Sequence, residues 1–135
     1  MSGCAKDTRI RMSDNTLKNV KDLKVGDEVI SVYLKNGVEY IETDFIEKII
    51  VHKCKNGLEQ LVTLGNLKIT SHHPIIDFGS NNWTNPIDIY KSRLEECDEV
   101  YNFILCKRHN VLIEDYVFKT YEVEDNIIQL HMANL

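Results

Sequence analysis

Several features that would define a protein class are missing from this sequence of 135 residues. No apolar run approaches the ~20 residues that a membrane-spanning helix requires, and the N-terminus lacks the charged and apolar regions of a signal peptide. Basic residues form no cluster and the formal net charge is -5. An acidic chain of this kind gains little binding free energy from contacts with phosphate groups. We therefore expect neither a membrane protein nor a nucleic-acid-binding protein.

No C-x-x-C pair occurs among the four cysteines, which are Cys4, Cys54, Cys97 and Cys106. This absence argues against a zinc knuckle and against a thioredoxin-type motif. A chain of this length buries a core without disulfides or metals. We therefore expect reduced thiols and a cytoplasmic location, with the three later cysteines acting as small buried apolar residues.

The residues that are present are typical of one soluble globular domain, which we expect to be a monomer. Hydrophobic residues make up 43% and charged residues 27%, which are ordinary proportions. The length suits a single domain. There is no internal repeat and no low-complexity tract.

Turn signals alternate with short runs that are rich in β-branched and aromatic residues. Asn-Gly, which tolerates the positive φ of a type I′ hairpin turn, occurs at residues 36–37 and 56–57. Gly65-Asn66 and Glu114-Asp115 also divide apolar runs at hairpin spacing, and residues 79–82 are typical of an open loop. The pattern predicts an all-β fold built from hairpins.

Three segments differ from the short hairpin strands. Residues 39–53 predict one long, curved strand, because apolar positions persist and the cap-and-stop pattern of a helix is missing. Residues 88–96 are the best helical candidate, so the fold holds at most one short helix. Residues 127–132 predict either a last strand or an ordered tail.

Three groups of residues could carry chemistry. Cys4 is a thiol just before a predicted strand, and by itself it is equally compatible with an incidental thiol. Thr70 lies three residues before His73, which a proline holds in an extended conformation; histidines at such a strand end are also compatible with plain surface residues or with metal binding. The third group comprises residues 100–105 and His109, and a lone histidine there is usually structural.

In this order and spacing the three groups resemble the Hint superfamily, which unites inteins, bacterial-intein-like domains, hedgehog autoprocessing domains and other Hint modules. The opening block of that family, C-x-x-x-(D/G)-T-x-(I/V)-x-(M/L/T)-x-D-G-x-x-K-x-(I/V)-x-(D/E)-(L/I)-x-x-G-D-x-V, is its most specific motif. Asn15 replaces the usual glycine and tolerates the same positive φ. The matching residues of the three blocks are Cys4, Thr8, Ile10, Met12, Asp14, Lys18, Val20, Asp22, Leu23, Gly26, Asp27 and Val29, then Leu67, Ile69, Thr70, His73 and Pro74, then residues 100–105 and 109–111.

A W-x-x-P pattern at Trp83 and Pro86 is similar to that of Hint modules linked to von Willebrand-type domains. The resemblance implies a flattened all-β horseshoe of hairpins with pseudo-two-fold halves, whose chain ends meet at a central cleft. It assigns residues 4–121 to the autoprocessing domain. Residues 1–3 would be an upstream flank or an expression remnant, and residues 122–135 a C-terminal strand or tail with a C-terminal junction.

The resemblance also implies an activity, which is self-processing through an N-to-S acyl shift. Cys4 would be the nucleophile that attacks the Gly3 carbonyl, so that the Gly3–Cys4 amide becomes a thioester. His73 would protonate the leaving nitrogen. The Thr70 hydroxyl would hold the scissile amide or the oxyanion.

The sequence departs from the family pattern in its later part. Asn102 stands where inteins and hedgehog domains commonly carry an aspartate, and an amide cannot take the thiol proton as a carboxylate would. His109 matches the histidine that assists the C-terminal junction of inteins, yet the usual His-Asn ending is missing after residue 121. Asn134 is a late candidate for the cyclising residue, and Leu135 after it cannot be the next nucleophile.

We therefore expect N-terminal cleavage or transfer, in a single-turnover autocatalytic reaction without a cofactor. Its partners would be covalently attached host segments, one upstream and potentially one downstream. The terminal Gly3 of the upstream segment fits a ubiquitin-like module, and water, a thiol or an amine would accept the acyl group. Full splicing with cyclisation of Asn134 is the alternative.

Two other functions are compatible with the residues. A zinc module would draw on Cys4, His52, Cys54, His72, His73 and His109, although the H-x-C spacing is tighter than in structural zinc sites. An inhibitory zinc ion at Cys4 and His73 is easier to reconcile with a thiol that meets an imidazole. The second alternative is a processing-inactive Hint-fold module that only binds.

Overall fold

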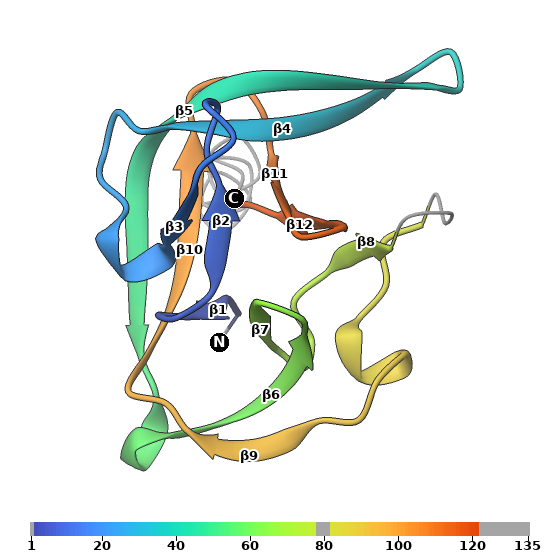
Figure 1. Ribbon diagram of the computed structural model, residues 1–135. Coiled ribbons are helices and arrows are strands. Elements are labelled where there is room, and N and C mark those ends of the chain that lie inside the picture. The colour runs from blue at the N-terminus through green and yellow to red at the C-terminus, as the bar shows by residue number, and fades with distance from the viewer. Residues whose placement is uncertain (1, 78–81, 122–135) are drawn as a thin grey trace, which may run out of the picture.

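The computed structural model describes residues 2–77 and 82–121 (Figure 1). Its regular elements are strands, together with three 3-10 turns, η1 (Val20–Asp22), η2 (Lys55–Gly57) and η3 (Pro86–Asp88). This described part contains no α-helix, and no helix in it is long and apolar enough to cross a membrane. The all-β class is therefore confirmed, whereas most of the expected loop at 79–82 and the C-terminal tail lie outside the described residues.

The strands form one large antiparallel sheet and two small ones. The large sheet has the order β4 (Glu28–Lys35), β5 (Val38–Lys53), β10 (Glu99–Leu105), β1 (Cys4–Ala5), β7 (Leu67–Thr70), β6 (Leu58–Leu64) and β9 (Arg93–Glu96). A second sheet has the order β11 (Asn110–Ile113), β12 (Tyr116–Lys119) and β8 (Ile75–Asp77), and a third pairs β2 (Arg9–Arg11) with β3 (Leu17–Asn19). Figure 1 shows the short β1 near the centre of this arrangement.

The predicted long, curved strand is present as β5. Residues 38–45 of β5 pair with β4, and residues 46–53 pair with β10. Between the two halves the register shifts, because Lys48 opposes Ile104 while Ile46 opposes Leu105, which leaves Glu47 as an extra residue. Such a bulge bends a strand, and Figure 1 shows β5 turning from the top of the molecule down its side.

The turn predictions are confirmed at three hairpins and wrong at a fourth position. Asn36-Gly37, Gly65-Asn66 and Glu114-Asp115 each close a hairpin, and Asn36 and Gly37 both have positive φ. Asn15 also has a φ of 69°, as its place in the opening block predicts. Asn56-Gly57 forms η2 but joins no hairpin, because β5 pairs with β10 while β6 pairs with β7 and β9.

The predicted helix at residues 88–96 is wrong. The segment starts with the end of η3, and its last four residues form strand β9, which pairs with residues 58–61 of β6 at the edge of the large sheet. The amide and carbonyl groups of β6 offer a complete row of hydrogen-bond partners to this segment. That gain outweighs the weak local helix preference of a short sequence.

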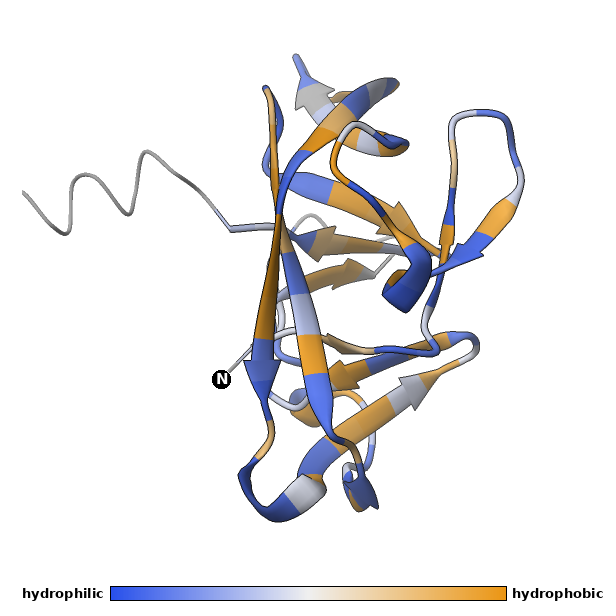
Figure 2. Ribbon diagram, turned by 90° about the vertical axis from the view of Figure 1, so that its left-hand side faces the viewer, coloured by the Kyte–Doolittle hydropathy of each residue, from blue (hydrophilic) through white to orange (hydrophobic). Residues whose placement is uncertain are grey.

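The core joins the large sheet to the second sheet. Phe103 of β10 and Phe118 of β12 are its largest fully buried side chains, and their ring centroids are 6.2 Å apart. Cys4 belongs to the same cluster, and a smaller cluster contains Ala5, Cys54, Leu61, Cys97 and Val100. Figure 2 shows apolar and polar residues alternating along the strands, as expected for strands that bury one face.

All four cysteines are free thiols in the structure. Cys54 and Cys97 are buried as predicted, with their sulfur atoms 3.7 Å apart. Cys106 is exposed instead, because it lies just beyond the end of β10 where the chain leaves the sheet. The expectation that all three later cysteines are buried is therefore wrong for Cys106.

Candidate active site at the Gly3–Cys4 junction

The Gly3–Cys4 bond lies inside the large sheet rather than in a loose end of the chain. Cys4 opposes Tyr101 of β10 on one side and Ile69 of β7 on the other. The backbone N–H of Thr70 donates to the Gly3 carbonyl at 2.9 Å, and the Gly3 N–H donates to the Thr70 hydroxyl at 3.1 Å. The Thr70 hydroxyl thus holds the Ser2–Gly3 amide, and the Thr70 backbone N–H holds the carbonyl of the Gly3–Cys4 bond.

The Cys4 thiol is completely buried. Its sulfur lies 3.7 Å from the Tyr101 carbonyl oxygen, in a geometry that lets the S–H donate to it. Burial raises the pKa of the thiol to about 12, and the opposing effect of the neighbouring Thr8 hydroxyl is smaller. Near neutral pH the group is therefore a thiol, which would have to lose its proton to act as a nucleophile.

His73 is buried against the ring of Phe118, with the two ring centroids 3.9 Å apart. Its Nε2 lies 2.6 Å from the Lys119 carbonyl oxygen, and its Nδ1 contacts the Ser2 hydroxyl. A carbonyl only accepts hydrogen bonds, so Nε2 carries the proton and Nδ1 is the acceptor that faces the upstream flank. Burial lowers the pKa of His73 to about 4, so the ring is neutral near pH 7.

The chain places His73 there through a turn after β7. The strand ends at Thr70, and the His73 N–H then donates to the Thr70 carbonyl at 3.1 Å. Two residues of one short motif therefore flank the junction, with Thr70 bonded to Gly3 and His73 bonded to Ser2. The sequence spacing of a hydroxyl three residues before a His-Pro pair produces this arrangement.

Asn102 is buried on β10 next to this junction. Cys4 opposes Tyr101, so continuing the antiparallel register places Asn102 opposite Gly3. Its side-chain oxygen accepts the N–H of Phe103 at 2.7 Å. The group is neutral and already bonded to its own strand, which gives the thiol no carboxylate base at this position.

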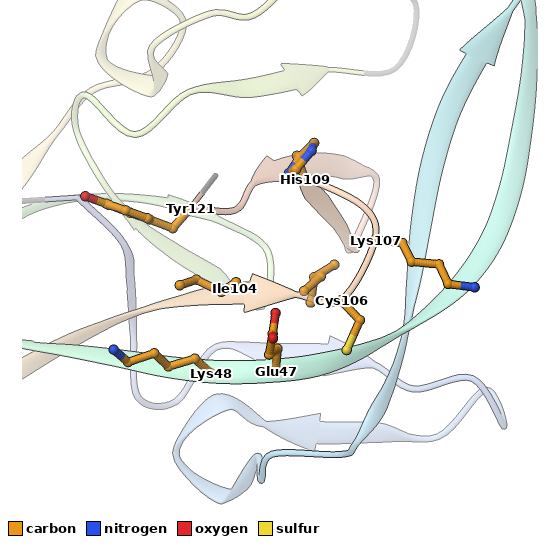
Figure 3. A pocket seen from close by; sticks show the side chains of 8 residues that line it. Glu47, Lys48, Ile104, Cys106, Lys107, His109 and Tyr121 are labelled. Carbon is orange, nitrogen blue, oxygen red and sulfur yellow. The ribbon is translucent and has the colours of Figure 1, made fainter. Parts of the chain in front are cut away.

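His109 lies at a second place, in the loop from β10 to β11. It lines an open cavity of about 510 Å³ together with Cys106 and Tyr121, and none of the residues that hold the Gly3–Cys4 bond lines that cavity (Figure 3). The buried Asp44 carboxylate fixes the loop, because it accepts the N–H groups of Lys107 at 2.8 Å and Arg108 at 2.7 Å. Asn134, the other residue predicted for a C-terminal junction, lies outside the described residues.

The sequence reasoning missed three residues around these places. Thr8 was only a pattern match, yet it lies beside the Cys4 thiol and bonds the β7 backbone at Lys68. Ser2 was assigned to a loose flank, yet it contacts His73. Asp44 carried no signal, because its role depends on a loop that lies more than sixty residues further along the chain.

The candidate metal ligands are spread over the described residues. Within residues 2–77 and 82–121, no three His, Cys, Asp or Glu side chains gather closely enough to hold a metal ion. Both nitrogens of His73 have partners, at Ser2 and Lys119. A zinc ion shared by His73 and Cys4 would have to displace one of these two partners. Inhibition by zinc stays a prediction, which a zinc titration of the self-processing activity would test.

Comparisons with solved structures identify the fold. The solved bacterial intein-like domain from Clostridium thermocellum is similar over 90% of this chain and 99% of that one, with 17% identity and a TM-score of 0.71. A DnaB intein from Synechocystis sp. PCC 6803 covers 90% of this chain over its whole length, with 11% identity and a TM-score of 0.68. The gp41-1 intein covers 89% of this chain and 99% of its own, with 15% identity and a TM-score of 0.56. These likenesses confirm the intein-type fold.

A comparison with curated proteins found no match. Residues 3–128 match the family model Vint, described as a Hint-domain. The match includes both sides of the Gly3–Cys4 bond and extends over nearly all of the chain. The chain therefore belongs to the Vint family of Hint domains, which is part of the autoprocessing Hint superfamily.

Proposed function

We propose that this domain cleaves or transfers its own upstream flank. The Cys4 thiol attacks the Gly3 carbonyl carbon through a five-membered ring, and the Gly3–Cys4 amide becomes a thioester. An acceptor then takes the Gly3 acyl group, which leaves Cys4 at the new N-terminus of the domain. The reaction occurs once per chain and needs no cofactor.

The observation that carries this proposal is the way in which the scissile carbonyl is held. A chain segment just before a domain normally frays unless something ties it down. Here the Gly3 carbonyl accepts a 2.9 Å hydrogen bond from the Thr70 N–H, while the adjacent Cys4 is fixed between two strands. A preorganised donor on the oxygen that becomes negative favours attack on that carbonyl.

Proton transfer is the second requirement. As the Sγ–C bond forms, the thiol loses a proton, and as the C–N bond breaks, the Cys4 nitrogen gains one. The step is therefore an isomerisation with no net gain or loss. His73 is suited to carry the proton, because its Nδ1 is unprotonated and accepts from the Ser2 hydroxyl on the upstream flank. Its lowered pKa makes the protonated ring a strong acid toward the leaving amine.

The second step consumes the thioester. Water, a thiol or an amine attacks the Gly3 carbonyl carbon, the carbon–sulfur bond breaks, and the proton of the acceptor goes to the departing sulfur of Cys4. With water the result is hydrolysis of the flank, and with an amine the flank is ligated to another molecule. An acceptor is needed because a thioester is less stable than the amide from which it forms.

Full splicing is the second candidate, and one contact favours it. The Tyr121 N–H donates to the Phe103 carbonyl at 2.8 Å, only two residues along β10 from Tyr101, which opposes Cys4. Both sides of the domain therefore approach the same strand, as a reaction that joins two flanks requires. Cyclisation of Asn134 would have to release the downstream segment.

A reporter domain fused before Met1 tests the proposal. The purified fusion is incubated with and without dithiothreitol or hydroxylamine, and the products are followed by intact mass. We expect thiol-dependent release of the reporter, complete loss of release in Cys4→Ala, and unchanged release in Asn134→Ala. The exposed thiol of Cys106 provides a matched control, because Cys106→Ala should release the reporter like the wild type.

The outcomes separate the candidate functions. Joined flanks that disappear in Asn134→Ala would establish splicing. An inert wild-type fusion with a normal fold would contradict self-processing and leave a Hint-fold module that binds. Activity that a chelator restores, without a change in folding, would identify an inhibitory metal ion.

A further inference from the structure

The residue before Cys4 has no room for a side chain. A Cβ atom built on Gly3 would lie 2.5 Å from the carbonyl oxygen of Tyr101, 2.9 Å from its carbonyl carbon and 3.1 Å from its nitrogen. All three atoms belong to the backbone of β10, so no side-chain rotation relieves the contact. Real Cβ atoms essentially never approach a heavy atom to within 3.0 Å.

The requirement comes from space and not from the backbone conformation of Gly3. Its φ is outside the left-handed region, in contrast to Gly26, Gly37, Gly57 and Gly65, which all have positive φ. An L-residue could therefore adopt the conformation of Gly3, and only the neighbouring strand forbids it. Because Cβ is common to all other residues, the first added carbon already creates the whole conflict.

Neither strand can move easily to make room. Tyr101 lies in the middle of β10 and is paired with Val51 of β5 on the side away from Cys4. Gly3 is bonded to Thr70 through both its N–H and its carbonyl. A shift of Gly3 away from β10 would therefore disturb the hydrogen bond that holds the scissile carbonyl.

We propose that this domain processes only acyl donors whose last residue is glycine. The proposal rests on the proposed function and names its substrate class: a polypeptide flank that ends in glycine and is cleaved from, or transferred by, Cys4. The selecting element is the backbone of β10 at Tyr101. A flank that ends in any other residue binds with its carbonyl out of line with the thiol and the Thr70 amide.

The test compares reporter fusions in which only residue 3 differs. A misplacement of about 1 Å at a reacting centre can cost about 100-fold in rate, so we expect Gly3→Ala to slow thiol-dependent release by about that factor. Gly3→Val and Gly3→Phe should be at least as slow as Gly3→Ala. The loss should appear as one step between glycine and alanine.

Two results would overturn the proposal. One is release from Gly3→Ala within about twofold of the wild type, a difference no larger than that of an ordinary surface substitution. The other is a loss graded by size, with alanine accepted and only phenylalanine rejected, which would indicate a side-chain pocket. An inert wild-type fusion would contradict the proposed function itself.

A second measurement keeps the steric claim testable without any reaction. In the Cys4→Ala background the junction stays intact, and amide hydrogen exchange of Thr70 reports its bond to the Gly3 carbonyl. Adding Gly3→Ala should speed exchange at Thr70, while circular dichroism shows an unchanged fold. Equal exchange at Thr70 in both variants would show that the junction accepts a Cβ, and the proposal would fall even if the wild type cleaves.

Discussion

The two sides of the domain approach the same strand but are held in very different ways. At the upstream side, Cys4 opposes Tyr101, and Gly3 has hydrogen bonds through both its N–H and its carbonyl. Two residues further along β10, the Tyr121 N–H bonds to Phe103 beside the open cavity that His109 lines. The Gly3–Cys4 bond is buried and bonded on two sides, whereas Tyr121 is exposed.

This difference indicates that the preorganised polar groups lie at the upstream side of the domain. Preorganised donors accelerate a reaction only if they are aimed at the atoms that change charge. The upstream side has such a donor on the Gly3 carbonyl, a buried thiol and a buried imidazole. The downstream side has a loop that the Asp44 carboxylate fixes, and an open cavity of about 510 Å³.

The largest expected effect tests the upstream side. His73→Gln removes the group that we propose as the proton carrier while preserving much of the side-chain volume. General acid–base catalysis is typically worth 10²–10⁴-fold, so we expect reporter release to slow by about a factor of 100 or more. Intact mass over time gives the rate, and circular dichroism checks the fold.

An unchanged rate in His73→Gln would show that the junction proceeds without its imidazole. The buried imidazole would then not distinguish the upstream side from the downstream side. A rate that recovers only when the pH is raised would instead show that hydroxide replaces the ring as the base for the thiol.

A smaller effect concerns stability and pH. The folded pKa of His73 is about 4, below its ordinary value of 6.5, so the unfolded chain binds this proton more tightly than the folded chain. The contribution to the free energy of unfolding is fully present above about pH 6.5 and is lost as the pH falls toward 4. A difference of two to three pH units corresponds to about 3 kcal/mol.

Urea unfolding of Cys4→Ala, with and without His73→Gln, measures this contribution. Between pH 7.5 and pH 4 the variant that keeps His73 should lose about 3 kcal/mol more than the variant with glutamine, because other titrating groups are shared. Parallel losses in the two proteins would show that His73 is not buried in its neutral form.

The same contrast explains which features the sequence could predict. Hairpins such as Asn36-Gly37 depend on residues in direct succession, and the spacing of Thr70 and His73 fixes their common turn. Local chemistry therefore predicts the turns, whereas the proximity of Thr70 and His73 to the Gly3–Cys4 bond followed only from the family resemblance. The resemblance also implies the horseshoe of hairpins, which periodicity alone does not contain.

The remaining features depend on strands that meet from distant parts of the chain. Residues 93–96 became a strand because β6 offered an unpaired edge, and the Asn56-Gly57 turn joins strands that pair elsewhere. The buried Asp44 serves a loop at Lys107 and Arg108. No local pattern reports such partners, because their stabilisation arises only after the sheet has formed.

The smallest expected effect distinguishes the two sides most directly. His109→Gln makes the same chemical change as His73→Gln, but at the open cavity, whose lining excludes the residues that hold the Gly3–Cys4 bond. If upstream cleavage proceeds independently of the downstream side, release of an upstream reporter should stay within about twofold of the wild type. The matched pair of histidine variants, assayed side by side by intact mass, should therefore differ by about 50-fold or more.

A rate in His109→Gln as low as that in His73→Gln would mean that the two sides act as one catalytic unit along β10. Cleavage would then be the first half of a coupled reaction, and splicing would become the better explanation of why Tyr121 bonds to the strand that faces Cys4.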